Sequence, residues 1–306
     1  MTTAFVLSGG GSLGAVQVGM LAALCERGVR PDLLIGTSAG ALNAAYVAAR
    51  GFDEQTVEDL GRLWQRLRRP EVFPIDPVRQ VLALGGRRPS LCSSAPLRRL
   101  IAANLPIDQL EDARLPLHVV TTDVMSGAEL LLSTGDAASA VLASAAIPAV
   151  FEPVEREGHV LMDGGVANNT AISQAVALGA DRVVVLPAGF ACALSDPPSS
   201  PLAAATHALT LLIEQRLIVE IAQLSDRVEI VVLPPLCPLS VSAVDFRSSR
   251  ELMARAQRAS GDWLDSGGDR LPRPERFLSL HTHPGAPSAR RPRATSGLRQ
   301  PDQESA

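Results

Sequence analysis

The segment LLIGTSAGALNAA, residues 33–45, decides the fold of this chain. An apolar run ends abruptly at Gly36, and a helix-forming stretch begins directly after Ser38. A serine at a sharp strand-to-helix turn projects out of the backbone path, and the helix behind it directs N–H groups and the positive end of its dipole toward the same point. Gly36 and Gly40 leave room for such a turn. The spacing therefore indicates a nucleophilic Ser38, with an ordinary structural turn as the alternative.

The preceding part of the chain repeats this strand-to-helix pattern. TAFVLS, residues 3–8, is a short apolar run that stops at three glycines, and residues 14–28 have helical spacing. The segment at 31–38 and the helix at 39–51 form the next pair. Strand, helix, strand and helix in succession predict an α/β fold with a parallel sheet covered by helices on both faces.

The glycine-rich turn at residues 8–14, SGGGSLG, exposes consecutive backbone N–H groups that bind an anion. The anion is either a nucleotide phosphate or the oxyanion of an acyl-transfer intermediate, because Gly9, Gly11 and Gly14 also fit the dinucleotide fingerprint. The acid that a dinucleotide site needs about 20 residues later is poorly supplied, since Asp32 begins the next strand instead of ending it. The oxyanion interpretation is therefore favoured.

A nucleophilic serine needs a group that takes its proton. No histidine lies in a suitable loop after a strand: His159 precedes a strand, His118 lies within one and His207 lies in a helix. Asp163 follows a strand in LMDGG and precedes Gly164 and Gly165, which places a short carboxylate at a sheet edge with open backbone beside it. Taken alone, Asp163 fits an ordinary turn residue equally well.

Composition excludes several classes of protein. The 306 residues carry a net charge of −4 and only 3% aromatic side chains, which argues against nucleic-acid binding. Four scattered cysteines form no C-x-x-C pair, so neither a zinc site nor a disulfide framework is expected, and a reducing, cytoplasmic compartment is the default. His281 and His283 lie in a proline-rich tail and suggest no metal site.

The chain shows no targeting or membrane-spanning segment in its sequence. The N-terminus lacks a basic region and a cleavage site, and no apolar run reaches the about 20 residues of a spanning helix. The predicted helix at 202–224 is apolar on several faces, which fits core packing or contact with lipid. Peripheral membrane contact is therefore left open, and the arginines near the C-terminus could add to it.

The remaining segments continue the alternation of strands and helices. Residues 53–112 are expected to form short helices beside the sheet and to shape a pocket. Further elements are strands at 115–124, 128–135, 159–165, 181–189 and 226–235, and helices at 136–146, 169–180 and 248–266. We expect one domain over residues 1–266, followed by a disordered tail rich in proline and arginine at 267–306.

Together these blocks resemble the patatin-like phospholipase family. The ordered matches are GGGSLG at 9–14, GTSAG at 36–40, ASAAIPAVFEPV at 143–154 and DGGVANNTA at 163–171. The resemblance covers about residues 3–190. It implies a three-layer α/β/α fold with a mainly parallel central sheet, and a lipid acyl hydrolase that uses a Ser–Asp dyad without histidine or cofactor.

By position, the resemblance makes Ser38 the nucleophile and Asp163 the base. The glycine loop, Gly9, Gly10 and Gly11, would hold the oxyanion with help from the Ala39 N–H. One position departs from the family: Leu13 stands where members often carry Arg or Lys. A catalytically silent acyl-lipid-binding protein of the same fold is the alternative function, and a nucleotide-binding module is the second alternative.

Overall fold

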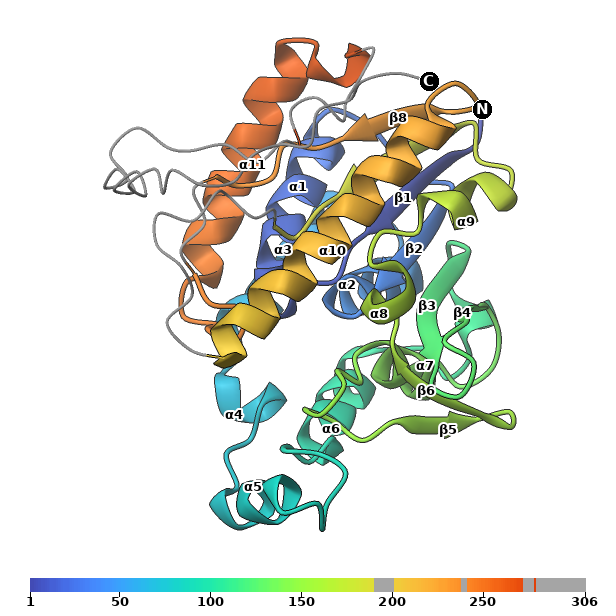
Figure 1. Cartoon of the computed structure of the whole chain (residues 1–306). Helices are drawn as coiled ribbons and strands as arrows, with labels where there is room; N and C mark the ends of the chain where they lie inside the picture. Colours follow the sequence, from blue (N-terminus) through green and yellow to red (C-terminus); the bar gives the residue numbers. More distant parts are fainter. Residues whose placement is uncertain (190–200, 238–240, 272–277, 279–306) are drawn as a thin grey trace, which may run out of the picture.

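The computed structural model describes residues 1–189, 201–237, 241–271 and 278. Its centre is an eight-stranded sheet with the order β5-β6-β3-β2-β1-β7-β8, and β4 pairs with β3 beside this path (Figure 1). The strands are β1 Thr3–Leu7, β2 Leu33–Thr37, β3 Leu117–Asp123, β4 Glu129–Leu132, β5 Val154–Arg156, β6 His159–Asp163, β7 Arg182–Leu186 and β8 Glu229–Val232. The pairs among β3, β2, β1, β7 and β8 are parallel, whereas β4, β5 and β6 join antiparallel.

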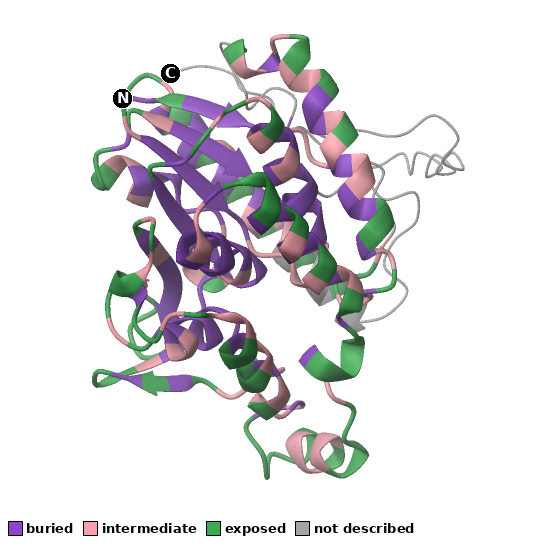
Figure 2. Cartoon of the chain, turned by 180° about the vertical axis from the view of Figure 1, so that it is seen from behind, coloured by how far each residue is buried: buried purple, intermediate pink, exposed green. Residues whose placement is uncertain are grey.

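Helices cover both faces of this sheet, which confirms the predicted three-layer α/β/α fold. Alternate residues of β1 divide between two buried clusters: Phe5 and Leu7 pack in one, Ala4 and Val6 in the other. The first cluster includes α1 Gly14–Glu26, α2 Ala39–Arg50, α3 Glu54–Arg66, α7 Ala137–Ser144 and α11 Ser249–Asp265. The second includes α9 Ile172–Ala177 and α10 Pro201–Leu224. Figure 2 shows the sheet as the buried layer between them.

The middle of the chain forms the short helices that were predicted there. They are α4 Arg69–Val72, α5 Pro77–Leu84 and α6 Ala95–Asn104, with a 3-10 turn at Leu110–Asp112. In Figure 1 these helices lie at the lower end of the molecule, on the side where β1 and β2 end. They therefore flank the edge of the sheet that carries the predicted site.

One strand and one α-helix were not predicted, and both are short. The strand β5 has three residues, too few for a periodic pattern, and α8 Gly165–Asn168 begins within the expected glycine turn. The helix expected at 169–180 is shorter, at Ile172–Ala177, because residues 169–171 connect α8 to α9. A 3-10 turn at Gly11–Leu13 also precedes α1.

The C-terminal part of the chain is described only in places. Gly268–Arg270 forms a 3-10 turn, and the Leu278 side chain is fully buried in the second cluster. The rest of the predicted tail, residues 272–277 and 279–306, lies outside the described residues. Among the helices that are described, none is both long and apolar enough to cross a bilayer.

Candidate active site

Ser38 lies at the turn between β2 and α2 in a backbone conformation that is rare for a side-chain-bearing residue. Its φ is 54° and its ψ is −118°, and its exposed fraction is 6%. Such conformations cost about 1–3 kcal/mol and persist only where the surroundings hold them. The adjacent helix also approaches β1 closely, since a Cβ on Gly40 would lie 2.2 Å from the Leu7 carbonyl oxygen. A Cβ on Gly36 would lie 2.5 Å from the Ala41 Cα.

A buried serine holds the backbone of this turn. The Ser38 N–H donates to Ser144 Oγ at 2.8 Å, and the Ser144 hydroxyl donates to the Val120 carbonyl at 2.6 Å. Ser144 is fully buried at the end of α7, so an unmatched N–H at Ser38 would be costly there. This supporting residue was quoted in the third family block but was not recognised as part of the site.

Asp163 lies beside Ser38 because of the strand register. Thr37, the last residue of β2, pairs with Val120 of β3, and Asp163, the last residue of β6, pairs with Thr121. Both site residues therefore lie next to the adjacent β3 residues Val120 and Thr121, on opposite sides of this strand. Asp163 is 6% exposed, and its Oδ1 accepts the Gly165 N–H at 2.8 Å.

Burial changes the acidity of this carboxyl group. It raises the pKa of Asp163 to about 6, while hydrogen bonds from the Ser38 hydroxyl and the Gly165 N–H act in the opposite direction. A carboxylate with a pKa near the working pH is a stronger base than an exposed aspartate, yet it remains mostly ionised at neutral pH. The pair can therefore move a proton between the serine hydroxyl and the carboxylate.

The glycine loop presents its N–H groups next to Ser38. A Cβ on Gly9 would lie 3.1 Å from the Ser38 Cβ, which places the loop in contact with the nucleophile. The N–H groups of Gly10, Gly11 and Ala39 have no hydrogen-bond partner within the described residues. Gly11 has a φ of 58°, and a Cβ there would lie 2.4 Å from the Ala243 carbonyl oxygen, so glycine is required at this position.

Gly9 differs from the other three predicted donors. Its N–H donates to Asn169 Oδ1 at 3.1 Å, and Asn169 Nδ2 donates back to the Gly9 carbonyl at 3.4 Å. Asn169 therefore joins the glycine loop to the segment that follows Asp163. The sequence interpretation missed this role, although the two adjacent asparagines in DGGVANN were a visible signal.

The neighbouring Asn168 joins the same segment to α10. Its Nδ2 donates to Glu220 Oε1 at 2.9 Å, and Glu220 is 8% exposed. Glu220 also accepts from the Ser173 hydroxyl at 3.1 Å and forms an ion pair with Arg216. The long helix thus contributes a buried carboxylate that fixes the position of the segment after Asp163.

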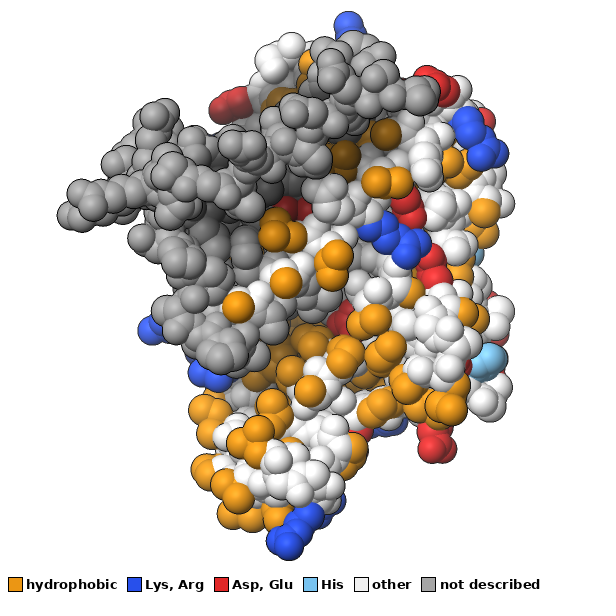
Figure 3. Space-filling model, in the orientation of Figure 1, with side chains coloured by type: hydrophobic (Ala, Val, Ile, Leu, Met, Phe, Trp, Pro, Cys, Tyr) orange, Lys and Arg blue, Asp and Glu red, His pale blue; other side chains and the backbone are white. Residues whose placement is uncertain are grey.

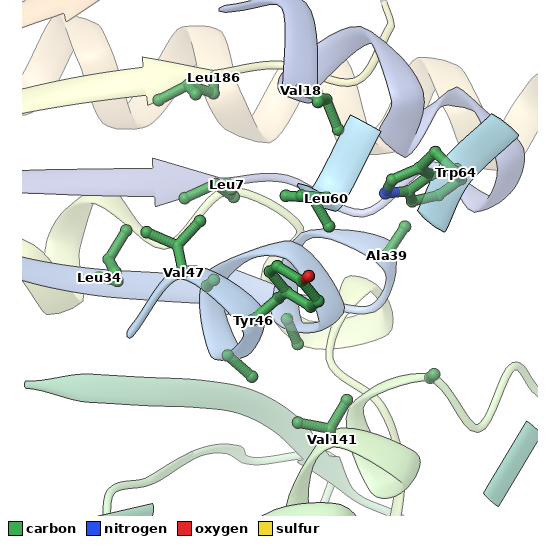
Figure 4. Packing of buried hydrophobic residues seen from close by; sticks show 14 of the residues in the cluster. Leu7, Val18, Leu34, Ala39, Tyr46, Val47, Leu60, Trp64, Val141 and Leu186 are labelled. Atoms are coloured by element: carbon green, nitrogen blue, oxygen red, sulfur yellow. The ribbon is translucent and has the colours of Figure 1, made fainter. Parts of the chain in front are cut away.

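A chain of buried polar side chains fixes both ends of the glycine loop. Gln17 Nε2 donates to the Ser8 carbonyl at 2.7 Å, and Asn43 Nδ2 donates to the Gly14 carbonyl at 3.0 Å. Asn43 also donates to Gln17 Oε1 at 2.9 Å and accepts the Trp64 indole N–H at 2.7 Å. Figure 4 shows Trp64 near Ala39, in line with a Gly14 Cβ position that would meet both residues.

The remaining predicted positions are also located. Gly164 passes close to β3, because a Cβ there would lie 2.3 Å from the Val120 carbonyl oxygen. Leu13 is half-buried and packs against the first cluster. Neither described histidine ring engages the pair: His118 hydrogen-bonds Ser133, and His159 hydrogen-bonds Asp123. Within the described residues, no three His, Cys, Asp or Glu side chains are grouped to hold a metal ion.

Comparisons with known proteins find a family model and several similar proteins. A family model described as "Patatin-like phospholipase" matches residues 5–176. Patatin-like phospholipase domain-containing protein 6 of Homo sapiens is 33% identical over 190 residues, covering 61% of this chain and 13% of that protein. Protein 7 of the same series, from Mus musculus, is 31% identical over 189 residues, with the same two coverages. The chain therefore spans only 13% of the length of these curated relatives.

Two further similarities were found. Lysophospholipase nte1 of Aspergillus terreus is 30% identical over 191 residues, which cover 60% of this chain and 12% of that protein. Among solved structures, VipD from Legionella pneumophila gives a TM-score of 0.47 at 19% sequence identity, covering 87% of this chain and 67% of that chain.

Proposed function

Because this chain belongs to the patatin-like phospholipase family, we propose that it is a serine acyl hydrolase that releases fatty acids from lipid esters. One observation carries the proposal: the strained Ser38 lies beside a buried Asp163 whose pKa is raised to about 6. A strained backbone conformation and a perturbed acidity at one point are typical of catalytic sites.

In the first step, Ser38 Oγ attacks the ester carbonyl carbon while Asp163 takes the hydroxyl proton. The carbonyl oxygen becomes an oxyanion, and we assign its stabilisation to the free N–H groups of Gly10 and Gly11, with the Ala39 N–H at the start of α2. When the intermediate collapses, the ester bond breaks and the alcohol leaves with the proton that Asp163 held.

In the second step, Asp163 takes a proton from water, and the resulting hydroxide attacks the acyl-enzyme carbonyl. Collapse of this intermediate returns the proton to Ser38 Oγ and releases the fatty acid. In this scheme Gly9 acts differently from the neighbouring glycines. Its N–H stays bonded to Asn169, so it fixes the loop and does not donate to the substrate.

The substrate class follows from the family and not from a mapped pocket. Relatives with patatin-like phospholipase and lysophospholipase names support a lipid ester as substrate. Peripheral contact with lipid is part of this proposal. Leu13 replaces a cation that would favour a phosphate headgroup, so we propose activity on lipid esters with and without phosphate. A panel that pairs phospholipids with neutral glycerides of equal chain length tests this. Turnover of phospholipids alone would contradict it.

Labelling with a fluorophosphonate probe tests the assignment of the nucleophile. We expect one covalent adduct in the intact mass of the wild type and none on Ser38→Ala. Ser93→Ala, at a half-buried loop position, is the control and should be labelled like the wild type. An adduct that persists on Ser38→Ala would overturn the assignment. A folded wild type without any adduct would instead favour the catalytically silent acyl-lipid-binding protein.

The nucleotide-binding alternative has its own test. A thermal-shift measurement with a mononucleotide would reveal binding at the glycine loop, because a ligand that binds only the folded state raises the melting temperature. We expect no shift, since we assign the free N–H groups of the loop to an oxyanion. The cytoplasmic location stays a prediction.

A further inference from the structure

The helix α5 has the reverse of the usual polarity for a surface helix. Three of its large apolar residues point outward: Val78 is 71% exposed, Val81 is 70% and Leu84 is 82%. Ile75, just before the helix, is 62% exposed and continues the same three-residue spacing. None of the eight residues of α5 is buried. A helix that directs its apolar stripe to solvent has that face available for another apolar phase.

The side of α5 that carries Arg79 faces the protein. The Arg79 guanidinium is 15% exposed and pairs with Glu152, and it donates to the Ser90 hydroxyl at 2.7 Å. The outward position of the valines is therefore fixed by contacts on the opposite side of the helix. It does not result from a helix without neighbours.

Residues 74–89, which we call the arm, are attached firmly at both ends. At the first end, Phe73 stacks on Phe151 with ring centroids 5.6 Å apart. At the second end, the N–H groups of Leu91 and Cys92 donate to the carbonyls of Ala149 and Val150, both at 2.8 Å. The arm is thus fixed where it joins the domain and carries exposed apolar side chains at its far end. It can insert into an apolar environment without refolding.

The charge around the arm is opposite to that of the whole chain. Residues 66–89 contain six arginines and two acidic residues, a net charge of +4, whereas the chain as a whole carries −4. The two acids are used locally: Glu71 accepts the Arg68 N–H at 2.7 Å, and Asp76 accepts the Arg79 N–H at 3.0 Å. Within the described residues, no ion pair involves the exposed side chains of Arg66, Arg68, Arg69, Arg87 and Arg88.

From these observations, we infer that the arm docks this protein on an anionic lipid bilayer. The apolar stripe of α5 enters the headgroup boundary while the unpaired arginines contact anionic headgroups, a combination typical of interfacial helices. Figure 3 shows hydrophobic side chains gathered over the lower part of this face, around α5. Because α5 lies on the side of the sheet where β1 and β2 end, docking brings the Ser38 edge toward the lipid (Figure 1).

The biological role of this docking surface rests on the proposed function, but binding to lipid vesicles does not itself require turnover. The test therefore measures co-sedimentation of the full chain with vesicles, in a Ser38→Ala background that leaves the lipids intact. Vesicles of phosphatidylcholine are compared with vesicles of equimolar phosphatidylcholine and phosphatidylglycerol. We expect binding to the anionic vesicles that weakens as salt is added.

Two variants of the arm and one rival surface make the test specific. We expect Val78→Glu/Val81→Glu/Leu84→Glu to lower the vesicle partition coefficient at least about tenfold, and Arg87→Glu/Arg88→Glu to lower it by a similar factor. Leu212→Glu/Val219→Glu places charges on exposed apolar positions of α10, the helix first considered for lipid contact, and should bind like the parent. Loss of binding in this variant but not in the arm variants would overturn the proposal.

Two further readouts separate the possible failures. The arm variants are also made in the protein that keeps Ser38. There they should not change the turnover of a water-soluble short-chain ester. If the wild type does not hydrolyse this ester but binds vesicles through the arm, the proposed function fails and the docking surface stands. If light scattering shows a dimer that the triple glutamate variant dissociates, and vesicle binding is absent, the arm is an interface between two copies and the proposal is wrong.

Discussion

The turns after β1 and β2 lie side by side at one edge of the sheet, and each leads directly into a helix. The first uses glycine where the backbone adopts a positive φ, at Gly11, whereas the second places a serine there, Ser38. Within the part of the chain that the structure describes, the N–H groups of Gly10 and Gly11 in the first turn have no partner, while the Ser38 N–H in the second is bound to Ser144. Two similar positions thus contribute different chemistry: main-chain donors from one and a strained side chain from the other.

The two turns are also supported in different ways. The first is held at both ends by Gln17 and Asn43, and in the middle by the Ala243 carbonyl, which accepts the Ser12 N–H at 2.7 Å. The second depends mainly on the single bond to Ser144. We therefore expect substitutions that alter the backbone to disrupt the first turn most. The second turn should be most sensitive to the loss of a few side chains.

Removal of the group that accepts the Ser38 proton should have the largest effect on activity, because the serine of the second turn then lacks its base. We expect Asp163→Asn to lower kcat/KM by about 10²–10⁴-fold, since asparagine cannot accept the Ser38 proton. Steady-state turnover of a short-chain ester measures this. Asp262→Asn, at an exposed position on α11, is the control and should keep wild-type turnover. Full activity in folded Asp163→Asn would mean that another group is the base.

The first turn can be broken through its backbone. We expect Gly11→Ala to lower kcat about 10²–10³-fold, because a Cβ there meets the Ala243 carbonyl and moves the donors away from the oxyanion. Gly28→Ala is the matched control: its φ of 67° is also positive, but nothing lies within 4 Å of the added Cβ. It should lose stability and keep activity. Equal activity loss in both variants would contradict the role of the loop.

The raised pKa of Asp163 predicts opposite pH dependences for activity and for stability. Activity should fall as the pH drops through about 6, because the carboxylate becomes protonated. Stability should change in the other direction. The folded pKa lies above the unfolded value, so ionisation penalises the folded state, and stability is lost as the pH rises from about 4 to about 6.

Asp163→Asn removes this penalty on the folded state. A pKa shift of about two units corresponds to about 3 kcal/mol of unfolding free energy. We therefore expect the variant to melt higher than the wild type at pH 8, by a margin that shrinks toward pH 4. Melting curves across this range measure it. A constant difference between the two proteins would show that the carboxyl group is not perturbed.

The support of the second turn can be removed separately. We expect Ser144→Ala to cost about 1–3 kcal/mol of unfolding free energy, because the buried Ser38 N–H loses its acceptor. The same change should reduce kcat, because the turn at Ser38 relaxes. Ser260→Ala is the control, since Ser260 is equally buried and its hydroxyl has no partner. It should be neutral or stabilising. Comparable losses in both variants would indicate a packing effect.

The smallest expected effect concerns the strain itself. Ser38→Gly should be about 1 kcal/mol more stable than Ser38→Ala, because glycine adopts the positive φ without a Cβ penalty. Both variants lack the nucleophile, so chemical denaturation compares them without any difference in activity. A more stable alanine variant would mean that the turn relaxes when the hydroxyl is removed.

The sequence alone was sufficient for the features that are local in the chain. The parallel strands, the serine turn and the glycine loop each have a short pattern, and the structure brings Ser38 and Asp163 together as the family resemblance implied. The supporting residues were not predictable in this way. Ser144 is 106 residues from Ser38, and Asn169 is 160 residues from Gly9, so no local periodicity reports those contacts. The outward face of α5 was hidden for a related reason, since burial depends on neighbours that a sequence pattern does not show.

The pairing of β1 with β7 has a consequence for how the chain is made. Residues 3–7 pair in parallel with residues 182–186, and the Ala188 N–H donates to Ser8 Oγ across 180 positions. At synthesis rates of about 5–20 residues per second, the N-terminal strand waits at least several seconds on the ribosome for this neighbour. Contacts of such long range make folding slow. The glycine loop waits longer still, because the Ala243 carbonyl that accepts the Ser12 N–H emerges after Ala188.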